Sequence, residues 1–199
     1  RKLNIGVSFV DKNGSYPYKD LHGVSVPDTL RILTLEEFLD YSLSRGDFRY
    51  IIEIKNGGEI GKRALDILYA TLKERDLLDR VIFGTFKNEI TEYASANYPD
   101  LIRSASVKEV LEFYIAALCG KKNYEPPVSV LQVFYGKQYF KFGVNLATSR
   151  VINYAHSHNM AIQYWTVNEE EDIEYLLSVG ADGIMTDYVE KAMGIKGRM

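Results

Sequence analysis

The chain has 199 residues, which is enough for one sizeable domain and short for two. Its 24 basic and 27 acidic residues leave a net charge of −3, and no basic run or stripe indicates a nucleic-acid partner. No apolar run approaches the roughly 20 residues that span a bilayer, so the sequence predicts no membrane span. The single cysteine, Cys119, excludes an internal disulfide and is expected to be a buried structural thiol at a helix end.

Turn-forming residues dominate the first part of the chain, and residues 1–33 are therefore expected to be a loop-rich insertion. Thr34 then predicts the start of a helix, because Glu37 three residues later completes a capping box. This helix is expected to run to about Ser44 and to stop at Gly46.

Beyond residue 50 the pattern alternates between strands and helices. Strands are predicted at residues 50–55, 81–86, 101–105, 128–134, 161–167 and 183–186. Helices are predicted at residues 60–76, 88–97, 107–118, 149–157 and 169–179. Such alternation is typical of an α/β fold with a parallel sheet and helices outside it. Asp187, at the end of the last strand, is expected to cap the helix that follows, and the alternative is that it binds a metal.

The number of strands bears on the type of sheet. A TIM-type (β/α)₈ barrel needs eight strands, whereas about six are predicted here. A doubly wound sheet could use six, but no Gly-rich turn follows the first strand to bind a nucleotide. A barrel whose N-terminal strands are missing from these residues would also give this count, and the family resemblance described below favours this incomplete TIM-type barrel.

The first predicted strand carries two charges near its end. Side chains alternate along a strand, so Glu53 and Lys55 share one face while Ile52 and Ile54 share the other. Charges in a parallel strand that is covered on both faces are costly unless they are paired, bind a metal or line a site. The alternative is an edge strand with one solvated face.

Four segments in chain order resemble the glycerophosphodiester phosphodiesterase family. Residues 32–39 (ILTLEEFL) resemble its PTLEE entry helix, although Leu33 replaces the usual proline. The other three segments resemble its EIK strand, its WTVN strand and its GVDGIITDYP ending, and they are residues 52–55 (IEIK), 163–168 (QYWTVN) and 180–188 (GADGIMTDY). The resemblance implies a single barrel domain over residues 1–199, truncated at its N-terminus. The alternative is an unrelated α/β module with chance matches.

The family's activity follows from the same resemblance. It implies hydrolysis of glycerophosphodiesters to glycerol 3-phosphate and an alcohol, with a divalent metal (Mg or Ca) held by carboxylates and two catalytic histidines. The family's HRG, E-x-D and HD elements are absent from these residues, and His22, His156 and His158 lie in other contexts. We therefore expect the C-terminal two-thirds of a family domain, with none of the family's catalytic residues in this chain.

The resemblance also assigns roles to three residues. It makes Glu53 a metal ligand, Lys55 a phosphate contact and Trp165 the ring that packs on the glycerol moiety. Phe86, at the end of the next strand, is a further candidate wall of the pocket, and Gln132 a candidate polar group pointing into it. For Trp165 the alternative is a core aromatic inside a barrel, and for Gln132 it is a plain core or turn role.

These assignments lead to two functional hypotheses. In the first, the intact protein hydrolyses a small-molecule glycerophosphodiester, while the fragment alone is inactive and holds metal weakly or not at all, because one carboxylate is a poor ligand set. In the second, the chain is a catalytically dead barrel remnant. Such a remnant would bind a partner or form a homo-oligomer through its open barrel edge.

Overall fold

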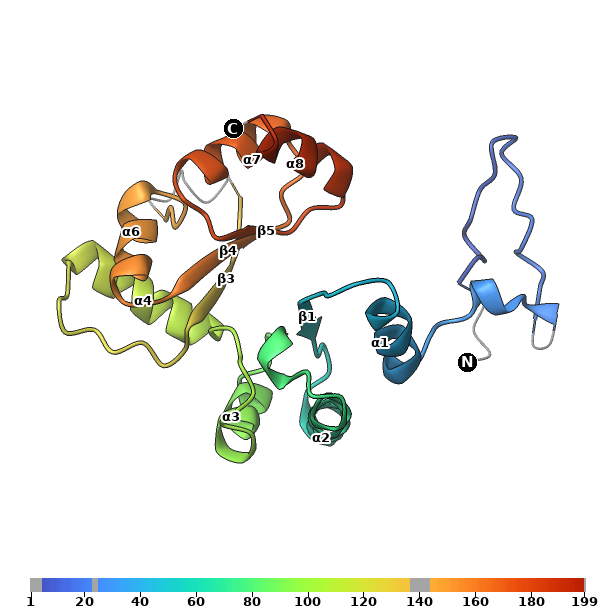
Figure 1. Cartoon of the computed structure of the whole chain (residues 1–199), viewed down its shortest axis with the longest axis horizontal. Helices are drawn as coiled ribbons and strands as arrows, with labels where there is room; N and C mark the ends of the chain where they lie inside the picture. The colour runs from blue at the N-terminus through green and yellow to red at the C-terminus, as the bar shows by residue number, and fades with distance from the viewer. Residues whose placement is uncertain (1–4, 23–24, 137–143, 199) are drawn as a thin grey trace. The chain divides into compact units, whose positions relative to one another are not determined.

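The structure is a computed structural model that describes residues 5–22, 25–136 and 144–198 (Figure 1). Two compact units are recognised, Arg1–Arg49 and Tyr50–Met199, and each is described by itself. Within the described residues no helix is long and apolar enough to cross a bilayer.

The first unit consists of turns followed by helix. Turns and the short 3₁₀ helix η2 (Asp28–Leu30) precede α1 (Leu35–Leu43). The predicted capping box is present, because the Thr34 hydroxyl accepts from the Glu37 amide and the Glu37 carboxylate accepts from the Thr34 amide at 2.9 Å. The helix ends at Ser44, as predicted.

The second unit contains the strand–helix alternation that the sequence predicts. Its strands are β1 (Tyr50–Glu53), β2 (Val81–Gly84), β3 (Val130–Phe134), β4 (Ala161–Trp165) and β5 (Gly183–Ile184). Its helices are α2 (Gly58–Glu74), η3 (Leu78–Arg80), α3 (Asn88–Asn97), α4 (Val107–Cys119), α6 (Ser149–Ser157), α7 (Glu170–Ser178) and α8 (Val189–Lys196).

All of the strand pairs are parallel. β1 pairs with β2, and β3, β4 and β5 form a second sheet in that order. Residues 102–105 connect the two sheets, because Ser104 donates its amide to Phe83 on one side and Ala105 donates to Val130 on the other, at 2.8 and 2.9 Å. The predicted strand at 101–105 is thus reduced to two isolated bridges. The extended segment is short because α4 begins directly after it, with Ser106 as the N-cap residue.

The parallel α/β architecture is confirmed, and the strands of the described residues do not close into a ring (Figure 1). β1 and β5 lie at opposite ends of the strand order and have no partner strand on their outer sides among the described residues. Parallel strands in sequence order, with helices between them, are the arrangement of part of a barrel wall.

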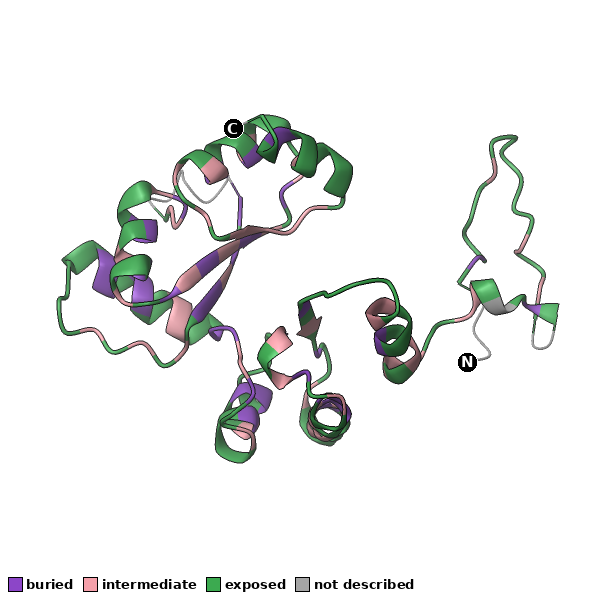
Figure 2. Ribbon diagram, viewed as in Figure 1, coloured by how far each residue is buried: buried purple, intermediate pink, exposed green. Residues whose placement is uncertain are grey.

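The core of the second unit lies between β3 and β4 and the helices that cover them (Figure 2). In β4 burial alternates, so that Ile162 and Tyr164 are buried. The alternate residues of the same strand, Gln163 and Trp165, are only half-buried. Since neighbouring side chains point to opposite faces, packing of Ile162 and Tyr164 turns Trp165 toward the other face of the sheet.

The prediction for Cys119 was wrong. Its thiol is exposed at the last position of α4, where Gly120 ends the helix with φ of 62°. The buried side of the helix is formed by Phe113, Ala116 and Ala117. At about 100° per residue, Cys119 lies roughly 200° around the helix from Ala117, so its side chain points away from that residue.

Candidate functional site

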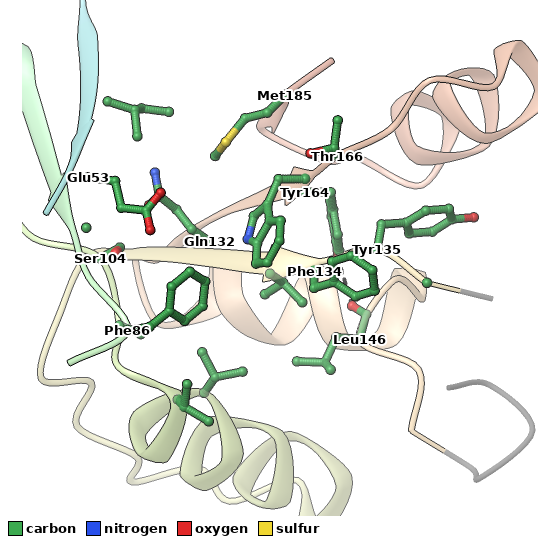
Figure 3. A pocket seen from close by; sticks show the side chains of 18 of the residues that line it. Glu53, Phe86, Ser104, Gln132, Phe134, Tyr135, Leu146, Tyr164, Thr166 and Met185 are labelled. Carbon is green, nitrogen blue, oxygen red and sulfur yellow. Dashed lines mark hydrogen bonds between the residues drawn. The ribbon is translucent and has the colours of Figure 1, made fainter. Parts of the chain in front are cut away.

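A cavity of about 800 Å³ opens where the parallel strands end (Figure 3). Its walls come from the C-terminal parts of β1, β2, β3 and β4, from the loops that follow them and from the start of α4. In α/β proteins with parallel strands, this edge is where binding and catalytic groups gather.

Glu53 and Lys55 both line this cavity. Ile51 lines it too, whereas Tyr50 and Ile54 are buried on the other side of the strand, as the alternation predicts. The Lys55 Nζ lies 3.2 Å from the Glu53 Oε2, and the two side chains are 80% and 34% exposed respectively. Both hypotheses for this strand hold in part, because β1 is an edge strand and its charged face also borders a cavity.

Three aromatic side chains form one wall of the cavity. The Trp165 ring meets Phe86 edge-on at a centroid distance of 5.6 Å and Phe134 at 5.0 Å. Phe86 is 59% exposed and Trp165 half-buried, so these rings present apolar faces to the cavity rather than filling a closed core.

Phe134 was not predicted from the sequence as part of this wall. It follows Gln132 by two residues and lies opposite Trp165 in the parallel register. The sequence could have predicted it, because side chains two residues apart on a strand share a face, and Phe134 therefore lies on the same face as Gln132.

Gln132 lines the cavity, as expected, and is held by a neighbour. Its Nε2 donates to the Oε1 of Gln163 at 3.1 Å, and the two residues are paired across β3 and β4. A side chain at Gly84 would come within 3.1 Å of the Gln132 Oε1, so glycine leaves room for this amide. Ser104, buried and bordering the same space, was also not singled out from the sequence (Figure 3).

The described residues do not fit a divalent metal by themselves. Glu53 is the only carboxylate among the described residues that line the cavity. No group of three or more His, Cys, Asp or Glu side chains able to hold an ion occurs in the part of the chain that the structure describes. Mg²⁺ and Ca²⁺ require about six or more oxygen ligands, and Glu53 already has the Lys55 ammonium beside it.

Apart from the Glu53–Lys55 pair, the titratable side chains among the described residues that line the cavity are two phenols, Tyr135 and Tyr164. No histidine is found among the described residues that line it. His156 instead pairs with Asp182 at 2.9 Å, and the His158 Nδ1 lies 2.9 Å from the Tyr154 carbonyl oxygen. Burial first, and then the nearby Asp172 carboxylate, raise the pKa of Tyr135 to about 12. A phenol with this pKa is neutral at physiological pH and is a poor general base.

Asp187 does not cap α8. Tyr188 is the N-cap residue and makes no side-chain capping bond. The Asp187 Oδ2 instead accepts from the Asn168 Nδ2 at 2.9 Å, which ties the segment after β4 to the segment after β5. Asp187 therefore bonds to a residue far away in the sequence, and the predicted capping bond to the start of α8 is not formed.

This arrangement has a definite chemical capacity. Lys55 supplies a flexible point charge for phosphate oxygens, the amide of Gln132 supplies a polar contact, and the rings of Trp165 and Phe86 supply an apolar surface. The described lining residues thus suit the binding of a phosphorylated organic molecule, and they include no histidine.

Comparison with known proteins places the chain in a family. Residues 10–191 match the glycerophosphoryl diester phosphodiesterase family. The Bacillus subtilis protein YqiK is 25% identical over 169 residues, which cover 83% of this chain and 63% of YqiK. The chain therefore spans somewhat less than two thirds of that relative.

Two solved structures have a similar fold. A glycerophosphodiester phosphodiesterase from Parabacteroides distasonis superposes with a TM-score of 0.65 at 19% identity, covering 95% of this chain and 76% of that one. An Oleispira antarctica phosphodiesterase, solved in complex with its product sn-glycerol-3-phosphate, gives 0.59 at 17% identity, covering 82% and 61%. These likenesses agree with the match over 182 residues, and the chain belongs to the glycerophosphoryl diester phosphodiesterase family.

Proposed function

We propose that the intact protein hydrolyses glycerophosphodiesters to glycerol 3-phosphate and an alcohol, and that these residues supply part of its substrate pocket. The main observation in support of this proposal is that Glu53 and Lys55 lie at the end of a parallel strand, beside a cavity with an aromatic wall. Family membership supports the reaction class, and the product bound by the Oleispira antarctica phosphodiesterase supports a phosphorylated glycerol as ligand.

Each residue has a proposed role in binding. Lys55 attracts the phosphate oxygens, Gln132 hydrogen bonds to the polar part of the ligand, and Trp165 and Phe86 pack on the carbon atoms of the glycerol moiety. Glu53 holds Lys55 in place in this chain. In an intact barrel Glu53 would be one ligand of a divalent metal, together with carboxylates that these residues do not include, and that metal would neutralise phosphate charge.

A second candidate is a binding module without catalysis. The observation that favours it is the lack of histidine among the described residues lining the cavity. Without an acid–base pair, a loss of several orders of magnitude in cleavage rate is expected. Self-association through the outer edges of β1 and β5 belongs to this candidate, because unpaired strand edges template further pairing.

Ligand binding by the 199-residue chain is tested first. Trp165 is the only tryptophan, so its fluorescence reports on the cavity directly. We expect sn-glycerol 3-phosphate to change this fluorescence saturably, and glycerol alone to have little effect. A flat titration would contradict the pocket assignment.

Hydrolysis is tested by release of glycerol 3-phosphate from glycerophosphocholine with Mg²⁺ or Ca²⁺. We expect no turnover by these 199 residues and robust turnover by a longer form that carries the family's histidine elements. In that longer form, Glu53→Gln should abolish metal-dependent activity. Unchanged kinetics would refute Glu53 as a metal ligand, and turnover by a longer form without those histidines would refute their role.

A further inference from the structure

A continuous stripe of large apolar side chains runs along the exposed side of α4. It consists of Val107, Leu111, Ile115 and Leu118, which are 62%, 58%, 53% and 48% exposed, and we call it the α4 stripe. Residues spaced by three or four positions share one face of a helix, so the four side chains form a single band. Exposed apolar bands of this kind mark surfaces that bind something.

The α4 stripe is not the side by which the helix packs on its own unit. Phe113, Ala116 and Ala117 serve that purpose and are buried. Ile115, for example, is a large apolar side chain at an exposed position, where a solvated helix face would ordinarily carry a charged or polar group. The helix is thus apolar on two faces, of which the core uses one.

Basic side chains gather at the C-terminal end of the α4 stripe. Lys121 and Lys122 are exposed directly beyond the helix end. Arg150, also exposed, donates to the carbonyl oxygen of Leu118 at 2.7 Å and so lies against the last residue of the stripe. Lys108, near the first residue of the stripe, forms an ion pair with the Glu112 carboxylate on the same helix at 3.9 Å, so the basic flank lies at the C-terminal end. An apolar band with cationic flanks is the pattern of a helix that lies in the surface of an anionic membrane.

A second copy of the chain fits this surface less well. In a two-fold symmetric contact the same patch meets itself. If the two helices ran antiparallel, Lys121 would approach Lys108 of the other copy, and if they ran parallel each basic end would meet its equivalent. Either contact brings like charges together, whereas anionic lipid head groups would neutralise them.

We propose that the α4 stripe and its basic flank dock this protein on the surface of an anionic phospholipid bilayer. Val107 belongs both to the stripe and to the lining of the cavity. Docking through the stripe would therefore bring the wall of the cavity formed by the start of α4 close to the lipid surface. This inference rests on α4 and the basic side chains beside its C-terminal end, and it is independent of the proposed function.

The test uses the 199-residue chain and two kinds of vesicle. One contains phosphatidylcholine alone and the other contains equimolar phosphatidylcholine and phosphatidylglycerol. Cys119 is the only cysteine, is exposed and adjoins Leu118, so a polarity-sensitive dye attached there reports insertion at the stripe. We expect co-flotation with the phosphatidylglycerol vesicles, a blue shift of the dye, and weakening of both by added salt.

The decisive variant is Leu111→Ser with Ile115→Ser, which removes apolar area while leaving the charges unchanged. We expect it to weaken vesicle binding by about tenfold or more, since each side chain is worth roughly tenfold when buried in lipid. Its matched control is Val189→Ser with Met193→Ser, a pair also four residues apart on a helix and equally exposed at 64% and 62%. The control should bind vesicles like the unmodified chain, and circular dichroism of both variants verifies folding.

Four outcomes would overturn the proposal. They are no co-flotation with either vesicle, equal binding to both vesicles, loss of binding in the α8 control as large as in the α4 variant, and a dimer in light scattering that only the α4 variant dissociates while vesicle binding persists. The last of these would assign the stripe to a second copy of the chain.

Discussion

At the scale of single residues, the Glu53–Lys55 pair is the feature with the clearest consequences. The two groups are within contact distance, and Lys55 remains largely exposed. An incoming phosphate would be attracted by the ammonium and repelled by the carboxylate. Each charge contributes about 1 kcal/mol at 4 Å in water, which corresponds to about fivefold in affinity.

We therefore predict that Lys55→Gln weakens binding of sn-glycerol 3-phosphate to the 199-residue chain by about fivefold or more. The measurement is a Trp165 fluorescence titration in metal-free buffer. Lys108→Gln is the matched control, because Lys108 is 79% exposed and also has a carboxylate partner. Equal effects of the two substitutions would show that Lys55 acts only through the net charge.

Glu53→Gln should act in the opposite direction in the same titration. Removing the carboxylate takes away repulsion and frees Lys55, so binding should tighten by about two- to fivefold. Glu112→Gln, the corresponding change beside Lys108, should leave the affinity unchanged. Weaker binding by Glu53→Gln in metal-free buffer would mean that Glu53 contacts the ligand directly as an acceptor.

At the scale of elements, the start of α4 is held by a compact polar cluster. The Glu109 carboxylate accepts two hydrogen bonds from Arg103, at 2.9 and 2.8 Å, and one from the Ser106 amide at 2.7 Å. Ser106 in turn caps the helix by accepting from the Glu109 amide. Because Ser104 and Val107 border the cavity on either side of this cap, the cluster also fixes one wall of the site.

Glu109→Gln is predicted to lower the free energy of unfolding by about 1–3 kcal/mol, the range for a partly buried charge-assisted network. Burial disfavours the Glu109 carboxylate, but the hydrogen bonds from Arg103 and Ser106 outweigh it and lower the pKa of Glu109. Its contribution is thus present above the ordinary pKa of 4.5 and is lost as the pH falls through the lowered value.

Urea unfolding of Glu109→Gln across this acid range measures the effect. The control is Glu112→Gln, on the exposed side of the same helix, which should cost about 0.5 kcal/mol or less. If both variants lose the same amount of stability, or if the Glu109 variant keeps the full acid dependence, the assignment of the cluster is wrong.

At the scale of the whole second unit, two buried phenols couple stability to alkaline pH. Burial raises the pKa of Tyr164, whose hydroxyl donates to the Leu146 carbonyl at 2.8 Å, and it also raises the pKa of Tyr135 to about 12. The unfolded chain releases these protons near pH 10, whereas the folded unit retains them. Stability that is fully present below pH 10 should therefore fall as the pH rises from about 10 to about 12.

We predict that Tyr135→Phe is less stable than the unmodified chain at pH 7, since the hydrogen bond to Asp172 is lost, but declines less steeply above pH 10. Thermal unfolding followed by circular dichroism from pH 7 to about 11 checks this. The exposed Tyr188→Phe is the control and should reproduce the original profile. Identical slopes for all three proteins would exclude Tyr135 as a source of the alkaline instability.

Much of the second unit could be predicted because its signals are local. The charges of Glu53 and Lys55 share a face because the strand repeats every two residues, and in the first unit the capping box predicted at Thr34 likewise lies within a single turn of helix. Cys119 and Asp187 were predicted incorrectly, since the exposure of one and the partner of the other depend on distant segments.

The sequence alone therefore determined most of the order of strands and helices, the family resemblance, and the shared face of Glu53 and Lys55. The tertiary structure decided which strands meet. Only the pairing of β3 with β4 brings Phe134 to Trp165 and Gln132 to Gln163, and only packing of α4 by its other side leaves the α4 stripe exposed. The physical reason is that periodicity along a strand or helix is a property of neighbouring residues, whereas register and burial are set by contacts between residues far apart in sequence.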